Sequence, residues 1–399
     1  MSAINICLYL YLLLKPFYLN SSGLMQISDI FILIAFVLTI ASLPKKTEET
    51  RKINLNLRIL LIFLLFVILI NSIYYGIYSD TSFLKSTLYY LFLFMGIYTF
   101  SKKIQDYKFL KYYYIIFIID LCAQLLIYFL DIGKYYGGTR YRGTFNDPNQ
   151  FAFFITLAIM YIYTLENVLN IKKRAWYAYI MAMFLIIKSA STGMILAIAT
   201  FSVVQIICGF GKVKKIFTSV FNKKTFYITN IVFLILFVVL AFDLFICNDD
   251  NDIKGRIEYR IGKTINSQAV NRLVSKFDKA KDKSNFLEDR HLDKFFSNPI
   301  YILYGAGEGK WDRFGNNNGE IHSTLPSILF CYGIVPTSIL MIWIYSNIKG
   351  LKLKELSVYI AILVESFTLI NHRQLLLWII IIIANLYKEE NRLKTNKGE

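Results

Sequence analysis

The sequence predicts an all-α fold, a polytopic transmembrane helical bundle of about twelve helices with a long external loop carrying short helices. Of the 399 residues 56% are hydrophobic and only 18% are charged, which is more apolar than a typical soluble domain. The apolar residues come in blocks of about twenty, the length that crosses a hydrocarbon core as a helix. Blocks such as 59–70 and 231–242 do not alternate apolar and polar residues, which argues against a transmembrane β-barrel.

The predicted helices divide the chain into three regions. Residues 1–247 hold the first nine helices, 248–321 form the long external loop, and 322–399 hold the last three helices and a cytoplasmic tail. The expected helices cover residues 3–19, 26–43, 57–77, 83–100, 110–131, 150–166, 175–189, 191–209, 226–247, 322–346, 355–371 and 374–388.

Lys and Arg residues gather in alternate inter-helix loops, which indicates the orientation of the chain. An even number of crossings with both termini cytoplasmic puts these loops inside, with Lys134, Arg140, Arg142 and Arg373 as the exceptions. The net charge of +17 therefore does not indicate a nucleic-acid partner, because the basic residues do not form one continuous face. The loops predicted to be cytoplasmic contain Lys45, Lys46, Arg51, Lys52, Lys102, Lys103, Lys108, Lys172, Lys173, Arg174, Lys212, Lys214, Lys215, Lys223, Lys224, Lys349, Lys352 and Lys354.

Two segments are then expected on the outer face, residues 132–149 and 248–321. In the first, Asn-Asp-Pro-Asn at 146–149 is a turn sequence that should end the loop just before the next helix. In the second, apolar residues at helical spacing over 270–277 suggest an amphipathic helix on the membrane surface. A further short helix is expected over 286–296, ending at Asn298-Pro299.

Polar side chains with a common chemistry gather at this outer face. Arginine binds phosphate oxygens bidentately with a permanent charge, and a lone histidine can take up a proton near neutral pH. Together they suit transfer of a group from a lipid pyrophosphate, with His322 removing a proton from the attacking hydroxyl. The candidate residues are Arg140, Arg142, Asn146, Asn149, Arg290, Glu320, His322 and Arg373.

No metal or cofactor is expected at this site. The acidic run at 249–252 contains one Asp-x-Asp spacing, Asp250-Asn251-Asp252, and is interpreted as a solvated linker, with metal binding as the alternative. The five cysteines lack metal-ligand or Cys-x-x-Cys spacing and are interpreted as small core residues.

Each candidate also has an interpretation without function. Arg140 and Arg142 could anchor the chain to lipid headgroups, and His322 could be an ordinary polar residue at a helix start. Arg290 could join a surface ion network with neighbouring acidic residues, whereas Glu320 could serve as an alternative base. The glycine-rich stretch 304–309 lacks the spacing of a dinucleotide site and is interpreted as a flexible turn.

The stretch Arg140-Tyr-Arg-Gly-Thr-Phe-Asn-Asp-Pro-Asn149 resembles the signature before a central helix in bacterial O-antigen and capsular polysaccharide polymerases and the related O-antigen ligases. The resemblance continues with an Arg before an aromatic helix (Arg290), Asn298-Pro299, Gly305-Ala-Gly-Glu-Gly309, a His at the next helix start (His322) and Tyr332-Gly333-Ile334. The chain departs from that pattern at Ser191-Thr192-Gly193, where many relatives have Ser-Arg, and at Ser323, where relatives often have Asn.

This resemblance implies a fold like that of type C glycosyltransferases and an inverting membrane polymerase of lipid-linked repeat units. The donor would be a glycan on undecaprenyl pyrophosphate, with Arg140 and Arg290 binding pyrophosphate and His322 acting as base. The expected location is the outer face of a bacterial cytoplasmic membrane. Expected partners are the lipid-linked oligosaccharide, the bilayer, and flippase and chain-length regulator proteins.

Three other functions stay open at this point. A ligase would move finished glycan onto another acceptor, and the sequence does not separate it from a polymerase. A flippase or other transporter should carry charged residues deep along several helices, whereas here the basic residues lie at one rim. A structural scaffold would leave the Arg and His residues unexplained.

Overall fold

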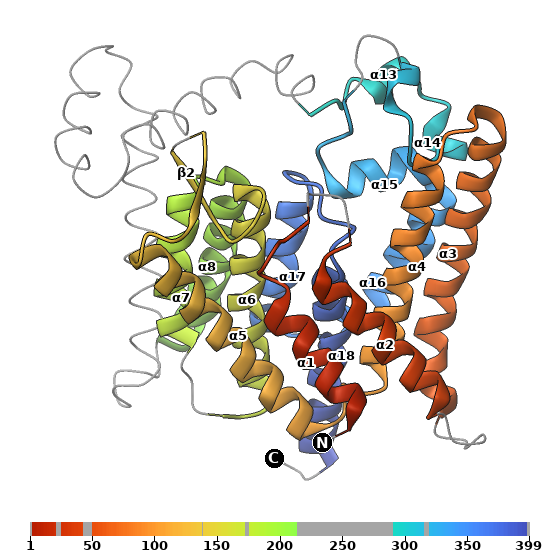
Figure 1. Ribbon diagram of the computed structural model, residues 1–399. Helices are drawn as coiled ribbons and strands as arrows, with labels where there is room; N and C mark the ends of the chain where they lie inside the picture. The colour runs from red at the N-terminus through yellow and green to blue at the C-terminus, as the bar shows by residue number, and fades with distance from the viewer. Residues whose placement is uncertain are drawn as a thin grey trace.

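The computed structural model describes residues 2–20, 25–42, 50–137, 139–171, 175–213, 290–314 and 319–396. These residues form a bundle of α-helices with one two-stranded hairpin (Figure 1). The helices of the N-terminal half are α1 (Ala3–Leu14), α2 (Ile27–Ala41), α3 (Thr50–Tyr78), α4 (Ser82–Ser101), α5 (Tyr107–Phe129), α6 (Pro148–Val168), α7 (Ala175–Ser189) and α8 (Thr192–Val213). Those of the C-terminal part are α13 (Lys294–Ser297), α14 (Tyr301–Tyr304), α15 (Thr324–Tyr332), α16 (Ile334–Ile348), α17 (Leu353–Ser366) and α18 (Leu375–Asn396), with a 3-10 turn at Trp311–Phe314.

Five helices are long and apolar enough to cross a membrane, among the residues that the structure describes. The central one is α6, because 89% of its most apolar window is buried against 33–44% in the other four. It packs against α5, α7 and α18, and Asp147 caps its first turn by accepting from the backbone of Asn149 and Gln150. The five helices are found within Asn56–Tyr78, Ser82–Ser101, Tyr107–Phe129, Pro148–Val168 and Thr192–Gly209.

Each predicted helix overlaps an observed one wherever the structure describes the chain, with bounds that differ by up to eight residues, and one predicted helix is divided. The predicted helix 322–346 is divided into α15 and α16 at Gly333, whose φ of +77° lies in the left-handed region. The prediction of one unbroken helix was therefore wrong. The predicted helix 226–247 and the amphipathic helix over 270–277 lie outside the described residues.

The two external segments differ in detail from the prediction. In the first, Lys134–Tyr136 (β1) and Arg140–Gly143 (β2) pair as an antiparallel hairpin, so the all-α prediction missed a small sheet. In the second, the described part of the expected helix 286–296 is helical only from Lys294, and it ends at Ser297 as predicted. The turn 146–149 does end the loop at the start of α6, which confirms that prediction.

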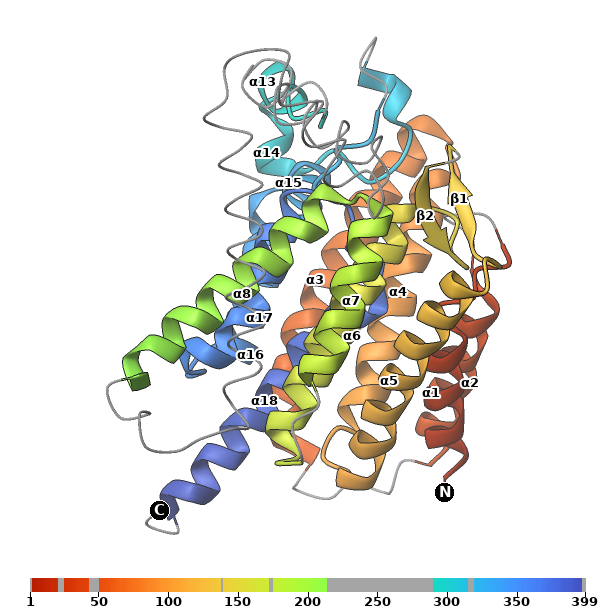
Figure 2. The same ribbon diagram turned by 90° about the vertical axis from the view of Figure 1, so that its left-hand side faces the viewer.

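The two ends of the bundle carry different parts of the chain. The beginning of α1 and the end of α18 lie at one end, whereas the hairpin and α13–α14 lie at the other (Figures 1 and 2). An even number of membrane crossings requires both termini to lie at the same end of the bundle. Which end faces the cytoplasm stays a prediction.

Candidate functional site

Arg140 lies at the start of β2 and is only 5% exposed. Its Nε donates to the backbone oxygen of Ser189 at 3.0 Å, and its Nη2 donates to Asn149 Oδ1 at 2.8 Å. The same Asn149 oxygen accepts from the hydroxyl of Ser191 at 3.1 Å. Arg140 therefore fastens the hairpin to the start of α6 and to the turn between α7 and α8.

Arg142 and Asn146 stabilise the loop that follows the hairpin. Arg142 Nη1 donates to the backbone oxygen of Asn146 at 2.6 Å, and Asn146 Nδ2 donates to the backbone oxygen of Asn20 at 2.6 Å. The side chains of Arg142 and Asn146, which were predicted to bind substrate, therefore bind backbone oxygens of the protein. In this structure both residues shape the loop before α6.

Arg290 and His322 are in direct contact although they are distant in sequence. The backbone N–H of His322 donates to the oxygen of Arg290 at 3.1 Å. Arg290 Nη1 in turn donates to the backbone oxygens of Phe367 at 3.0 Å and Thr368 at 2.6 Å. Arg290 thus connects the start of α15 to the turn between α17 and α18.

The His322 side chain is exposed, and its ring centroid lies 5.4 Å from that of His291. Partial desolvation of the ring and the neighbouring His291 lower the pKa of His322, while the Glu320 carboxylate opposes this shift. The imidazole therefore stays neutral to lower pH than an ordinary histidine. A neutral, solvent-accessible imidazole can accept a proton.

A buried carboxylate stands behind these groups. Glu308 is 1% exposed, and its side chain accepts from Tyr332 Oη at 2.8 Å, His372 Nε2 at 3.1 Å and Arg373 Nε at 2.8 Å. Burial alone would raise the pKa of Glu308, but the charges of Arg373 and His372 hold it below its usual range. Glu308 is therefore an ionised group inside the protein, compensated by its donors.

Arg373 joins Glu308 to Glu320. Its Nη2 contacts one oxygen of each carboxylate, and its side chain is 31% exposed. Glu320 is 24% exposed and precedes His322 by two residues. The structure thus brings Arg290, His322, Glu320 and Arg373 together at one end of the bundle.

The turn between α17 and α18 links this group to Arg140. Gly193, at the start of α8, lies so close to Thr368 that a Cβ atom at position 193 would overlap its side chain. Arg290 binds the backbone of Thr368, and Arg140 binds Asn149, which holds Ser191 two residues before Gly193. The two arginines therefore lie on either side of one contact between turns, and each donates to protein acceptors.

Glu308 is the residue that sequence reasoning missed. The stretch 304–309 was interpreted as a flexible turn, but backbone bonds join Ala306 N to Phe330 O at 2.9 Å and Gly307 N to Cys331 O at 2.8 Å. A glutamate inside a glycine-rich turn was the available signal.

Lys294 was also missed. It is 1% exposed, and its Nζ lies 5.9 Å from the centre of the Trp311 ring without a hydrogen-bond partner among the described residues.

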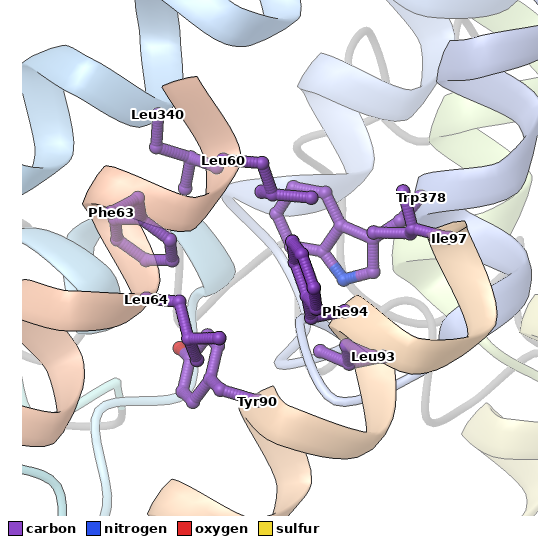
Figure 3. A pocket seen from close by; sticks show the side chains of 9 residues that line it. All are labelled: Leu60, Phe63, Leu64, Tyr90, Leu93, Phe94, Ile97, Leu340 and Trp378. Carbon is purple, nitrogen blue, oxygen red and sulfur yellow. The ribbon is translucent and has the colours of Figure 1, made fainter. Parts of the chain in front are cut away.

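A small apolar hollow lies between α3, α4, α16 and α18 (Figure 3). Tyr90 and Trp378 form part of its wall. The Tyr90 ring stacks on His372 with centroids 5.9 Å apart, and Trp378 Nε1 donates to the His372 backbone oxygen at 2.7 Å. The charged cluster is therefore backed directly by apolar packing between α3, α4, α16 and α18.

Comparison with protein-family models, with curated proteins and with solved structures finds no significant match to this chain. The fold and the cluster define an all-helical protein with helices of membrane-spanning length and an ionised site at one end. The resemblance to polysaccharide polymerases rests on the motifs quoted above.

Proposed function

We propose that this protein is a membrane glycosyltransferase that polymerises lipid-linked oligosaccharide repeat units. The observation that carries the proposal is the meeting of His322 with Arg290, Glu320 and Arg373 at one end of a bundle with membrane-spanning helices. A proton acceptor beside guanidinium groups at a lipid surface suits a hydroxyl acceptor and a pyrophosphate leaving group.

In the proposed reaction, the imidazole of His322 takes the proton of the acceptor sugar hydroxyl. The hydroxyl oxygen forms a bond to the anomeric carbon of the donor glycan as the bond from that carbon to the pyrophosphate oxygen breaks. The electron pair leaves with undecaprenyl pyrophosphate, whose charge a guanidinium stabilises. Attack opposite the leaving group inverts the anomeric centre.

The three arginines have different roles in the proposed reaction. The side chain of Arg373 is 31% exposed, whereas Arg140 is buried and donates to Ser189 and Asn149. We therefore assign phosphate contact to Arg373 and a positioning role to Arg140. Arg290 holds the backbone of Phe367 and Thr368 beside His322, so it positions the site in this conformation.

A polymer assay in cells lacking the gene tests the function. The null cells should carry glycan of one repeat unit, and the gene should restore the ladder of longer chains. His322→Ala should abolish the ladder, because loss of a general base costs about 10²–10⁴-fold in rate. Arg290→Ala should also fail to restore it.

Arg58→Ala is the matched control, since it removes an exposed guanidinium about 24 Å along α3 from Tyr74, which contacts Gly305. It should restore the ladder. Full ladders from both site variants at equal expression would overturn the site. Null cells that lack even the single capped unit would instead favour a ligase or a flippase.

A further inference from the structure

The Arg373 guanidinium has two carboxylate partners with very different surroundings. Its Nε and Nη2 face Glu308, whose side chain is 1% exposed, and Nη2 also contacts Glu320, whose side chain is 24% exposed. Nη1 has no hydrogen-bond partner in the described part of the chain and is not among its buried unpaired atoms. One edge of the guanidinium is fixed by the protein, and the other is open to solvent.

Glu308 is the permanent partner. It accepts from Tyr332, His372 and Arg373, and its backbone N–H donates to Asn71 Oδ1 at 2.9 Å. Withdrawing it would leave the Nε of Arg373 and the buried Tyr332 hydroxyl without their acceptor, which is unfavourable. Glu308 therefore fixes the position and the plane of Arg373.

Glu320 is the exchangeable partner. Its side chain is 24% exposed against 1% for Glu308, so water can solvate the Glu320 carboxylate once it leaves Arg373. Glu320 can therefore leave Arg373 at small cost when a stronger ligand arrives. A diphosphate is such a ligand, because its charge and oxygens match the Nη1–Nη2 edge that Glu320 partly covers.

We infer that Arg373 is a receptor for a diphosphate group, that Glu308 is its positioning residue, and that Glu320 occupies the receptor until the diphosphate displaces it. The exchange releases a carboxylate two residues from His322. Donor binding thereby places a negative charge beside the imidazole that must become positive when it takes a proton. This inference rests on the proposed function for the identity of the donor.

The test is binding of inorganic pyrophosphate to the full-length protein in detergent, measured by calorimetry. Glu320→Gln should tighten binding about threefold to tenfold, because it removes the competing charge of a partly exposed ion pair. Arg373→Ala should abolish binding. A merely structural Glu320 predicts the opposite, since its loss would loosen the site and weaken binding.

Asp312→Asn is the matched control, because it removes one exposed carboxylate from the same external segment and so changes the net charge equally. It should leave the affinity within about twofold, since an isolated exposed charge acts weakly through water and salt. Equal or weaker binding by Glu320→Gln than by Asp312→Asn overturns the inference. So does unchanged binding by Arg373→Ala.

A second arm identifies the source of the diphosphate. Undecaprenyl pyrophosphate in nanodiscs is compared with inorganic pyrophosphate for the wild type and the same variants. Tighter binding of the lipid form assigns the site to a lipid headgroup, and equal binding assigns it to free pyrophosphate. Absence of binding by either probe overturns the inference.

The two proposals fail separately. If Glu320→Gln tightens pyrophosphate binding but null cells still make the full ladder, Arg373 is confirmed as a diphosphate site and the polymerase function is wrong. If the ladder depends on the gene but Glu320→Gln does not tighten binding, the polymerase function is supported and the displacement of Glu320 by diphosphate is wrong.

Discussion

At the scale of single residues, the protonation of His322 depends on groups from separate segments. His291 and Arg290 come from the segment before α13, and Glu320 comes from the segment before α15. Partial burial and His291 lower the pKa of His322, and Glu320 raises it. A base with a lowered pKa is neutral over a wider acidic range, so the acidic limb of activity should lie below that of an ordinary histidine.

Substitution of these neighbours should move the acidic limb in opposite directions. His291→Ala removes a group that lowers the pKa of His322, so the limb should move to higher pH. Glu320→Gln removes the carboxylate that raises the pKa, so the limb should move to lower pH. The measurement is the pH dependence of glycan transfer by the purified protein in liposomes. A limb that neither variant moves would show that another group supplies the base.

Glu308 makes a prediction about stability. Glu308→Gln leaves Arg373 with Glu320 as its one acidic partner among the described residues and takes the anionic partner from the buried Tyr332 hydroxyl. Breaking a buried ion pair on one side costs about 3–5 kcal/mol, so the apparent Tm in detergent should fall clearly. Asp312→Asn, on an exposed residue, should change stability by less than about 0.5 kcal/mol. Equal melting of the two variants would mean that Glu308 is not ionised.

Contacts join Arg290 to His322 and Glu320 to Arg373, whereas Arg140 donates to Ser189 and Asn149. The sequence predicted a common face for these residues but did not indicate that Arg140 would bind groups of the protein. It did not make Glu308 predictable. Its burial comes from contacts with α3, α15 and the start of α18, and such long-range packing leaves no local pattern.

At the scale of elements, three glycines join the segment after α14 to the end of α15. Gly305, Gly307 and Gly333 have φ values of +79°, +66° and +77°. A Cβ atom at Gly333 would lie 2.5 Å from the backbone oxygen of Leu303, and one at Gly305 would lie 2.6 Å from that of Cys331. Both the backbone conformation and the close approach therefore require glycine.

Gly333→Ala should destabilise the protein, because it adds both left-handed strain and an overlap with backbone atoms that cannot move aside. Strain of this kind costs about 1–3 kcal/mol before the overlap is counted. Thermal unfolding in detergent measures the loss. Gly76→Ala is the control, since nothing lies within 4 Å of its added methyl and the position is helical. If Gly333→Ala unfolds at the same temperature as Gly76→Ala, the packing of these two segments does not contribute to stability.

One unbroken helix was expected over 322–346 because the bend at Gly333 leaves no mark in the hydropathy of the sequence. The segment is apolar on both sides of the glycine, and hydropathy alone reports length without reporting direction. The partner that bends the chain is the backbone of 303–305, which is distant in sequence. The turn 146–149 was the local signal that placed the start of α6, where Asp147 caps the helix and Pro148 is its first residue. The start of α5 was expected at residue 110, although Asp106 caps a helix that begins at Tyr107.

At the scale of the whole molecule, composition was sufficient to predict a helical membrane protein. Blocks of apolar residues gave helices of spanning length, and the most enclosed of them, α6, follows the turn that carries Asn149. The hairpin was not predictable in the same way. Its strands are only three and four residues long, and side-chain contacts of Arg140 and Tyr141 hold it against the bundle.

The arrangement of the two ends predicts a labelling pattern. In a cysteine-free background, Tyr136→Cys at the exposed hairpin should react with a membrane-impermeant thiol reagent in intact spheroplasts. Lys108→Cys, at the exposed start of α5, should react only after permeabilisation. Labelling of both positions in intact cells would contradict the predicted orientation.

The bonds from Ala306 to Phe330 and from Gly307 to Cys331 belong entirely to the main chain. Replacing a neighbouring side chain by alanine leaves them intact, so an alanine scan will report the joint that carries Glu308 mainly at its glycines, Gly305 and Gly333. The side chains next to these bonds can likewise be substituted during evolution while the backbone geometry is kept. Distant homologues should therefore be sought by the number of residues that separates Gly305 from Gly333, a measure to which residue-by-residue similarity gives little weight.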